Sequence, residues 1–175
     1  MGNIFFIGDT HFSDKNIINF EKRPFKNLLE QTERLTENWN KVVSENDIVY
    51  IVGDFVDNSI GTDHLKYIRK LNGTKYLIRG NHDNHDDEFY LNECDIKKVY
   101  DHPIILENFW IVSHEPMYVN SNYPYANIFA HVHNNPIYKT SSERHYCVSS
   151  ERTAFTPISF DYIKSVVYNY SNRKF

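Results

Sequence analysis

The sequence has few cysteines, no long apolar run and no excess of positive charge, and each absence excludes a class of protein. Only Cys94 and Cys147 occur among its 175 residues, so we predict a protein of the reducing cytoplasm without a disulfide framework. No apolar run approaches the about 20 residues that a membrane-spanning helix needs. The N-terminus also lacks the basic and apolar regions of a signal peptide, so we expect no membrane partner.

The charge balance argues against a protein that coats nucleic acid. Lysine and arginine total 19 against 23 aspartates and glutamates, which leaves a formal net charge of -4. Proteins that hold DNA or RNA stably are usually basic, so no stable nucleic-acid partner is expected. Bound divalent cations would nevertheless concentrate positive charge at one place and attract an anionic substrate.

What is present indicates a folded α/β protein. Hydrophobic residues make up 41% of the chain and charged residues 24%, a balance that favours a packed core over disorder. The length predicts a single domain over residues 1–175, and no internal repeat or low-complexity linker divides it.

The first half of the chain alternates strands and helices. We predict short strands at residues 3–8, 48–52 and 74–78, each ending at or near a glycine, and residues 48–52 form a continuous apolar run. Helical spacing of apolar residues lies between them, at 32–44 and 62–71. This alternation is typical of a sheet that carries helices on its faces.

The second half consists mainly of short strands. We predict them at residues 104–106, 109–113, 127–130, 137–139 and 145–149. Ser159 is then expected to cap a last helix whose apolar face is formed by Phe160, Ile163, Val166 and Val167. The predicted fold class is α/β, with a two-layer β-sandwich flanked by helices.

Polar side chains follow five of these predicted strands at the point where each strand ends. The five clusters span residues 9–11, 53–54, 80–83, 113–116 and 130–133. Ligands of open α/β sheets bind at the carboxyl ends of strands, so we expect the clusters to converge. A carboxylate directly after a core strand is hard to explain by packing, because burial demands a strong partner.

The residue types in these clusters are those of metal ligands. Oxygen and imidazole donors without cysteine suit Mn²⁺, Fe²⁺ or Zn²⁺. Seven such side chains exceed what one tetrahedral ion needs and fit two ions that share a bridging carboxylate. Pairs two residues apart point to one side of an extended backbone, so both members can enter one site. The seven side chains are Asp9, His11, Asp54, Asn81, His114, His131 and His133.

The same motifs, in this order, resemble the calcineurin-like metallophosphoesterase superfamily in its short bacterial and phage form. They are Asp9-x-His11, Gly53-Asp54, Gly80-Asn81-His82-Asp83, His114 and His131-x-His133. The resemblance spans residues 5–165 and implies a metallophosphoesterase fold of the αββα type. Two positions depart from the family, because Ala130 stands where glycine is usual and Glu115 where an aromatic residue is commoner.

The resemblance also implies a division of the ligands between two divalent metal ions. Asp9, His11 and His133 would bind the first ion, and Asp54 would bridge to the second. The remaining ligands of the second ion would be Asn81, His114 and His131. Mn²⁺ is the expected ion, with Fe, Zn or Ni as alternatives.

The reaction implied is hydrolysis of a phosphodiester or phosphomonoester by a metal-bridging hydroxide. His82 would assist the leaving group or the phosphoryl oxygens, and Asp57 would orient His82. Arg23 is a candidate phosphate clamp because a guanidinium binds phosphate through two hydrogen bonds. With Asn81 and His82 it completes the candidate substrate-binding set, and the expected substrate is a small phosphate ester or a nucleotide.

Several alternatives stay open at the level of the sequence. The chain could be a nuclease acting on DNA or RNA ends, or a non-catalytic protein-binding scaffold of the same fold. Loss of metal ligands would mark a scaffold, and none of the seven is missing from this sequence. An exposed turn explains Asp57 equally well, and Arg23 could belong to a turn that packs Phe25 inward. Asp83 is expected to anchor its loop by hydrogen bonds. The last candidates, for lining a substrate pocket, are Tyr118, Tyr123 and Tyr125.

Overall fold

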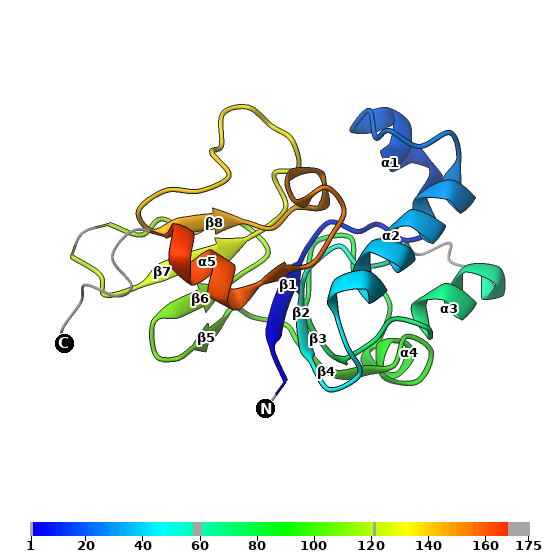
Figure 1. Ribbon diagram of the computed structural model, residues 1–175, viewed down its shortest axis with the longest axis horizontal. Coiled ribbons are helices and arrows are strands. Elements are labelled where there is room, and N and C mark those ends of the chain that lie inside the picture. Colours follow the sequence, from blue (N-terminus) through cyan, green and yellow to red (C-terminus); the bar gives the residue numbers. More distant parts are fainter. Residues whose placement is uncertain (1, 58–60, 121, 168–175) are drawn as a thin grey trace.

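The computed structural model describes residues 2–57, 61–120 and 122–167, and two β-sheets form its centre (Figure 1). The first sheet has the strand order β4-β3-β2-β1-β9, in which β1 to β4 are parallel neighbours and β9 pairs antiparallel with β1. Its strands are β1 (Ile4–Ile7), β2 (Ile48–Val52), β3 (Thr74–Ile78), β4 (Ile96–Tyr100) and β9 (Ile158–Ser159).

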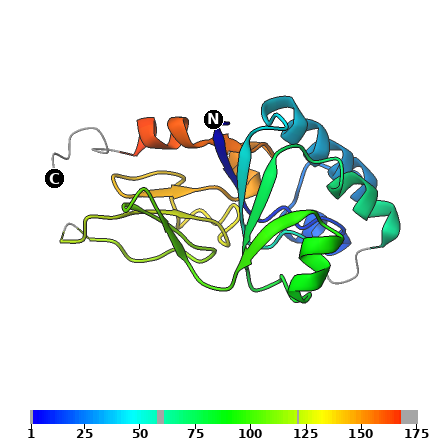
Figure 2. The same cartoon turned by 90° about the horizontal axis from the view of Figure 1, so that it is seen from below.

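The second sheet has the strand order β5-β6-β7-β8 and lies beside the first (Figure 2). Strands β6, β7 and β8 are parallel, whereas β5 pairs antiparallel with β6. Its strands are β5 (Ile104–Leu106), β6 (Trp110–Val112), β7 (Ala126–Phe129) and β8 (His145–Cys147). The α/β class with two sheet layers is therefore confirmed.

Helices cover the face of the first sheet that points away from the second sheet (Figure 2). Side chains alternate across β1, so Phe5 and Ile7 pack against the helices while Phe6 faces the other sheet. Leu35 and Trp39, four residues apart in the longest helix, are buried in the same outer core. The helices are α1 (Lys15–Phe20), α2 (Leu28–Val42), α3 (Thr62–Ile68) and α4 (Asp87–Asn92).

The core between the sheets is completed by the last helix, α5 (Phe160–Val166). The Ser159 hydroxyl oxygen accepts a hydrogen bond from the Tyr162 N–H at 3.3 Å, so the predicted N-cap is confirmed. The Phe160 ring lies 5.3 Å from the Phe6 ring and 5.5 Å from the Trp110 ring, which joins α5 to both sheets.

The two sheets meet at the carboxyl ends of β1 and β8. The Gly8 N–H donates to the Val148 carbonyl at 2.9 Å, and the Ser150 N–H donates to the Gly8 carbonyl at 3.0 Å. A Cβ at Gly8 would overlap the side chain of Ala130, so glycine is needed for this close approach. The junction brings loops from both sheets to one place.

One predicted strand is wrong, because residues 137–139 form a turn. The guanidinium of Arg152, in the 3-10 helix η1 (Ser150–Thr153), donates to the carbonyls of Asn135 and Tyr138. These bonds hold the segment in a turn and leave Ile137 83% exposed. The apolar residues Ile137 and Tyr138 therefore did not indicate a buried strand. None of the described helices combines the length and apolar character needed to span a bilayer.

Candidate metal centre

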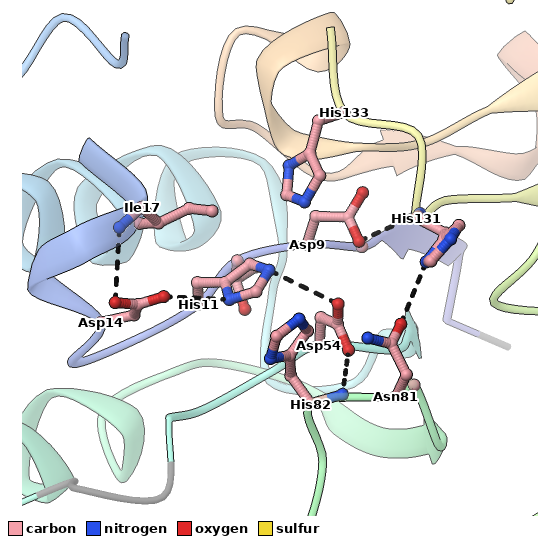
Figure 3. A network of polar contacts seen from close by, with 12 residues as sticks. Asp9, His11, Asp14, Ile17, Asp54, Asn81, His82, His131 and His133 are labelled. Atoms are coloured by element: carbon pink, nitrogen blue, oxygen red, sulfur yellow. Dashed lines mark hydrogen bonds and ion pairs between the residues drawn. The ribbon is translucent and has the colours of Figure 1, made fainter. Parts of the chain in front are cut away.

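The polar clusters that follow five predicted strands come together at the junction of the two sheets (Figure 3). The contributing strands lie far apart in the sequence, yet their carboxyl ends face one another. The side chains that meet are Asp9 and His11 after β1, Asp54 after β2, Asn81 and His82 after β3, His114 after β6, and His131 and His133 after β7.

A first donor group consists of Asp9, His11, Asp54 and His133. Each offers one ligand atom, and these atoms all lie within 4.8 Å of one another. Asp9 Oδ2 and His11 Nε2 are buried without a close hydrogen bond among the described residues, and the charged neighbour of His11 Nε2 is Asp54 Oδ2 at 3.5 Å. Because an unpaired buried polar atom costs free energy, these two atoms fit the coordination of a cation.

A second donor group consists of Asp54, His114, His131 and Asn81. Ligand atoms of the first three lie within 4.8 Å of one another. The Asn81 Oδ1 atom lies 3.0 Å from His114 Nε2 and 3.0 Å from His131 Nδ1, so the amide oxygen points at both rings. Asp54 belongs to both groups, and its carboxylate is therefore placed to bridge two cations.

Neighbouring groups fix the orientation of the imidazole rings. His114 Nδ1 lies 2.9 Å from the Val52 carbonyl, so Nδ1 donates its N–H to that oxygen and Nε2 faces the donor group. His11 Nδ1 lies 3.6 Å from a carboxylate oxygen of Asp14. A ligating histidine usually donates its second N–H to a carbonyl or carboxylate, as His114 does, and the Asp14 carboxylate faces the same nitrogen of His11.

The backbone bends sharply at five of the ligand positions. The φ angles are 53° at Asp9, 48° at His11, 53° at Asp54, 70° at His131 and 45° at His133. Residues other than glycine rarely adopt this left-handed conformation, which costs free energy and clusters at functional sites. The bends turn each side chain into the junction as its strand ends.

Two glycines allow the backbone to pass against the ligand side chains. Gly53 has a φ angle of 79°, and a Cβ there would overlap the ring of His114. A Cβ at Gly80 would overlap the carboxylate of Asp54. The Gly-Asp and Gly-Asn pairs that the sequence shows are thus a packing requirement of the site.

The electrostatics of the site reflect its dense carboxylates. Burial lowers the pKa of His11, but hydrogen bonds and charge interactions with Asp14 and Asp54 outweigh it and raise this pKa to about 9. Burial also lowers the pKa of His114, but the hydrogen bond and the charge of Asp54 outweigh burial and raise this pKa to about 9. Burial raises the pKa of Asp54, yet both imidazoles hold it well below its usual range. The donor groups therefore favour positive charge between them.

Asp83 joins the loops that follow β2 and β3. Its Oδ2 accepts from the Asp54 N–H at 2.7 Å and from the Gly80 N–H at 2.9 Å, and its Oδ1 accepts from the Phe55 N–H at 2.9 Å. The prediction that this carboxylate anchors its loop is confirmed. It also sets the position of Asp54.

His82 lies at the exposed edge of the donor groups. The backbone N–H of His82 donates to Asp54 Oδ1 at 2.8 Å, and its imidazole ring lies 5.2 Å from the ring of His11. Asp57 is half-buried, and its N–H donates to the Phe12 carbonyl at 2.8 Å. The catalytic role of His82 and the orienting role of Asp57 stay predictions.

The prediction that Arg23 clamps a substrate phosphate is wrong, because its side chain is buried and bound within the protein. Its Nε donates to Glu151 at 2.8 Å, and one terminal nitrogen contacts the Thr10 carbonyl and the Gln31 side chain. The other terminal nitrogen contacts the Asp9 carbonyl at 2.6 Å and Glu151 at 2.7 Å. All five donors are engaged, so none is left for a substrate phosphate. Arg23 holds the loop that carries the first ligands.

Glu151 is a site residue that the sequence reasoning missed. Its Oε1 lies 3.1 Å from His133 Nδ1, and its pKa is lowered to about 2 because His133 and Arg23 outweigh the effect of burial. It follows β8 at a strand end, which is the signal that could have found it. The carboxylate orients the His133 ring from outside the donor group.

We expect Glu151→Gln to weaken Mn²⁺ binding by about 10–100-fold, because the His133 ring loses its charged partner. Isothermal titration with Mn²⁺ measures the change. Glu115→Gln, at an exposed position next to His114, is the matched control and should bind like the unmodified protein. Equal Mn²⁺ affinity of the two variants, both folded by circular dichroism, would contradict the orienting role.

The fold and the site together define a class of protein, an α/β protein with a candidate centre for two metal ions at the junction of its two sheets. The sequence profile of the calcineurin-like phosphoesterase family matches residues 2–172. The chain therefore belongs to this family, and the resemblance seen in its motifs is confirmed. Membership supports a metal-dependent phosphoesterase in general terms.

Individual relatives agree with this assignment. An uncharacterized protein of Methanocaldococcus jannaschii is 40% identical over 94 residues, covering 53% of each chain. The gene 66 protein of Mycobacterium phage L5 is 35% identical over 89 residues, covering 47% of this chain and 41% of that protein. The chain thus matches about half the length, or less, of these curated relatives.

A solved structure shares nearly the whole fold. It is the crystal structure of a protein of unknown function from Aquifex aeolicus, which superimposes with a TM-score of 0.71 at 26% sequence identity. The similarity covers 94% of this chain and 99% of that chain. The layered α/β arrangement is therefore common to both proteins.

Proposed function

We propose that this protein hydrolyses a phosphodiester or phosphomonoester at a centre of two divalent cations. The observation that carries the proposal is the position of Asp54, whose buried carboxylate belongs to both donor groups. When bound, two such cations supply a hydroxide nucleophile at neutral pH and offset the charge of the phosphoryl oxygens. Oxygen and imidazole donors favour Mn²⁺, with Fe, Zn or Ni as alternatives.

The ligand side chains divide as follows in this proposal. Asp9, His11 and His133 hold the first cation, Asn81, His114 and His131 hold the second, and Asp54 bridges them. The buried Asp9 Oδ2 atom, which has no hydrogen-bond partner among the described residues, supports the first set. The Asn81 Oδ1 atom, which faces two imidazoles, supports the second.

His82 and Asn81 contact the substrate in this proposal. The exposed His82 ring lies beside the donor groups, and its imidazolium can protonate the leaving oxygen or bind a phosphoryl oxygen. The amide nitrogen of Asn81 can donate a hydrogen bond while its oxygen serves the cation. Asp57 would orient His82 from the loop after β2.

The proposed substrate is a small phosphate ester or a nucleotide, and the proposed location is the cytoplasm. Cys94 and Cys147 are both free and buried, which fits a reducing compartment. No stable association with nucleic acid or membrane is proposed, because the net charge is -4.

Metal removal tests the proposal. Treatment with EDTA is expected to reduce hydrolysis of both bis-p-nitrophenyl phosphate and p-nitrophenyl phosphate to background, because the nucleophile is lost with the cations. Addition of Mn²⁺ in excess should restore turnover, measured as release of p-nitrophenolate. Absence of turnover on either ester, together with absence of Mn²⁺ binding, would overturn the proposal and indicate a non-catalytic scaffold.

A further inference from the structure

A pocket of about 540 Å³ opens beside the candidate metal centre, and no role assigned so far uses it. This volume falls within the range of roughly 300–1,000 Å³ that small-molecule sites occupy. His131 and His133 line the pocket where it meets the donor groups, and Phe20, Lys22, Asn134 and Tyr138 line its other walls. It is therefore continuous with the place where a phosphate would bind.

Phe20 presents an aromatic ring to this pocket from a short helix that is anchored at both ends. Its side chain is 80% exposed, although it is large and apolar. The helix that carries it is held by the buried Ile17 and by Asp14, whose carboxylate accepts from the Asn16 N–H at 2.8 Å. The Arg23 N–H donates to the Ile18 carbonyl at 2.8 Å and secures the other end. A ring on a supported wall is suited to binding.

The pocket lies on the side of the site away from His82. The ring of His11 lies 5.2 Å from the His82 ring and 5.3 Å from the His133 ring, and Figure 3 shows it between them. If His82 accompanies the leaving oxygen, the leaving group departs on its side. The pocket beyond His133 then receives a group that stays attached to phosphorus.

We infer that the substrate is a phosphodiester whose retained ester group carries an uncharged planar ring, an aryl group or a nucleobase, which stacks on Phe20. The inference rests on the proposed function and narrows its substrate class. In the reaction, an oxygen of water bonds to phosphorus and the bond to the leaving oxygen breaks. That oxygen takes up a proton, and the phosphomonoester of the retained group is released.

The lining of the pocket matches this ligand. Phe20 supplies an aromatic face, on which planar rings stack favourably. Glu21 and Lys22 line the same wall with opposite charges, so the wall favours a neutral group. The exposed Asn134 amide offers a donor and an acceptor to the polar edge of a ring. A phosphomonoester carries no second ester group and would leave the pocket empty.

Two diesters with the same leaving group test the inference. Phenyl p-nitrophenyl phosphate and methyl p-nitrophenyl phosphate both release p-nitrophenolate and differ in the retained group. With the Mn²⁺-loaded protein, we expect Phe20→Ala to raise KM for the phenyl ester by about tenfold and to leave KM for the methyl ester unchanged. The kcat for either ester should change little, because the leaving group is the same.

Tyr162→Ala is the matched control, since Tyr162 is also an exposed aromatic residue but lies outside this pocket. It should leave both KM values unchanged. If both esters turn over and Phe20→Ala changes neither KM, or changes both equally, the inference is overturned while the proposed function stands. If the unmodified protein hydrolyses neither diester but releases p-nitrophenolate from p-nitrophenyl phosphate, the inference is overturned while the proposed function stands. If the Mn²⁺-loaded protein hydrolyses none of these esters, the proposed function itself fails.

Discussion

Replacing Asp54 with alanine is expected to reduce kcat on bis-p-nitrophenyl phosphate by at least about 10³-fold and to leave less than two Mn²⁺ ions bound per chain. The physical reason is that one buried carboxylate belongs to both donor groups, so its removal weakens both cations together. Its loss also leaves His11 and His114 without the carboxylate that favours positive charge there. Steady-state kinetics and metal analysis by mass spectrometry measure the two effects.

A second variant separates charge from folding in this test. Asp54→Asn keeps the shape of the side chain and an acceptor for the His82 N–H, which lies 2.8 Å from Asp54 Oδ1. It should lose turnover nearly as completely, because an amide is a weaker bridging ligand than a carboxylate. Asp63→Asn, at an exposed position, serves as the control. Retention of two ions and of wild-type kcat by the folded Asp54→Asn variant would contradict the bridging role.

The second large effect is expected at His82. His82→Ala should retain both Mn²⁺ ions, because its imidazole belongs to neither donor group. On a diester with an alkyl leaving group, kcat should fall by about 10²–10⁴-fold, the range of general acid catalysis. On an ester that releases p-nitrophenolate the loss should be much smaller, because this leaving group needs little protonation.

The dependence on the leaving group distinguishes His82 from a residue that only shapes the site. A structural defect would reduce kcat on both esters alike, whereas loss of a proton donor affects the poor leaving group selectively. His102→Ala removes an exposed imidazole elsewhere and should change neither rate. Equal kcat of His82→Ala and the unmodified protein on the alkyl ester would exclude the proposed role.

Strand and helix patterns in the sequence predicted most of the layered fold. Continuous apolar runs at β1 and β2 indicated buried parallel strands, because such strands are covered on both faces. Helix α1 has six residues and buries only Ile17, so it left no periodic signal. The turn at residues 137–139 could not be predicted, because it depends on hydrogen bonds from the distant Arg152.

The gathering of the predicted ligand side chains also followed from local patterns, because each of them lies just beyond a strand end. The residues that support them were harder to recognise. Glu151 contacts the ring of His133 and not a predicted cation, and the guanidinium of Arg23 binds Glu151 and backbone carbonyls. The contact between Arg23 and Glu151 joins segments 128 residues apart, and no local pattern contains that proximity.

Anomalous X-ray diffraction from crystals of the Mn²⁺-loaded protein tests the central claim most directly. The account predicts two manganese peaks, one among Asp9, His11 and His133 and the other among Asn81, His114 and His131, with the Asp54 carboxylate in contact with both. A single peak that does not touch Asp54, or no peak at the junction of the sheets, would contradict it.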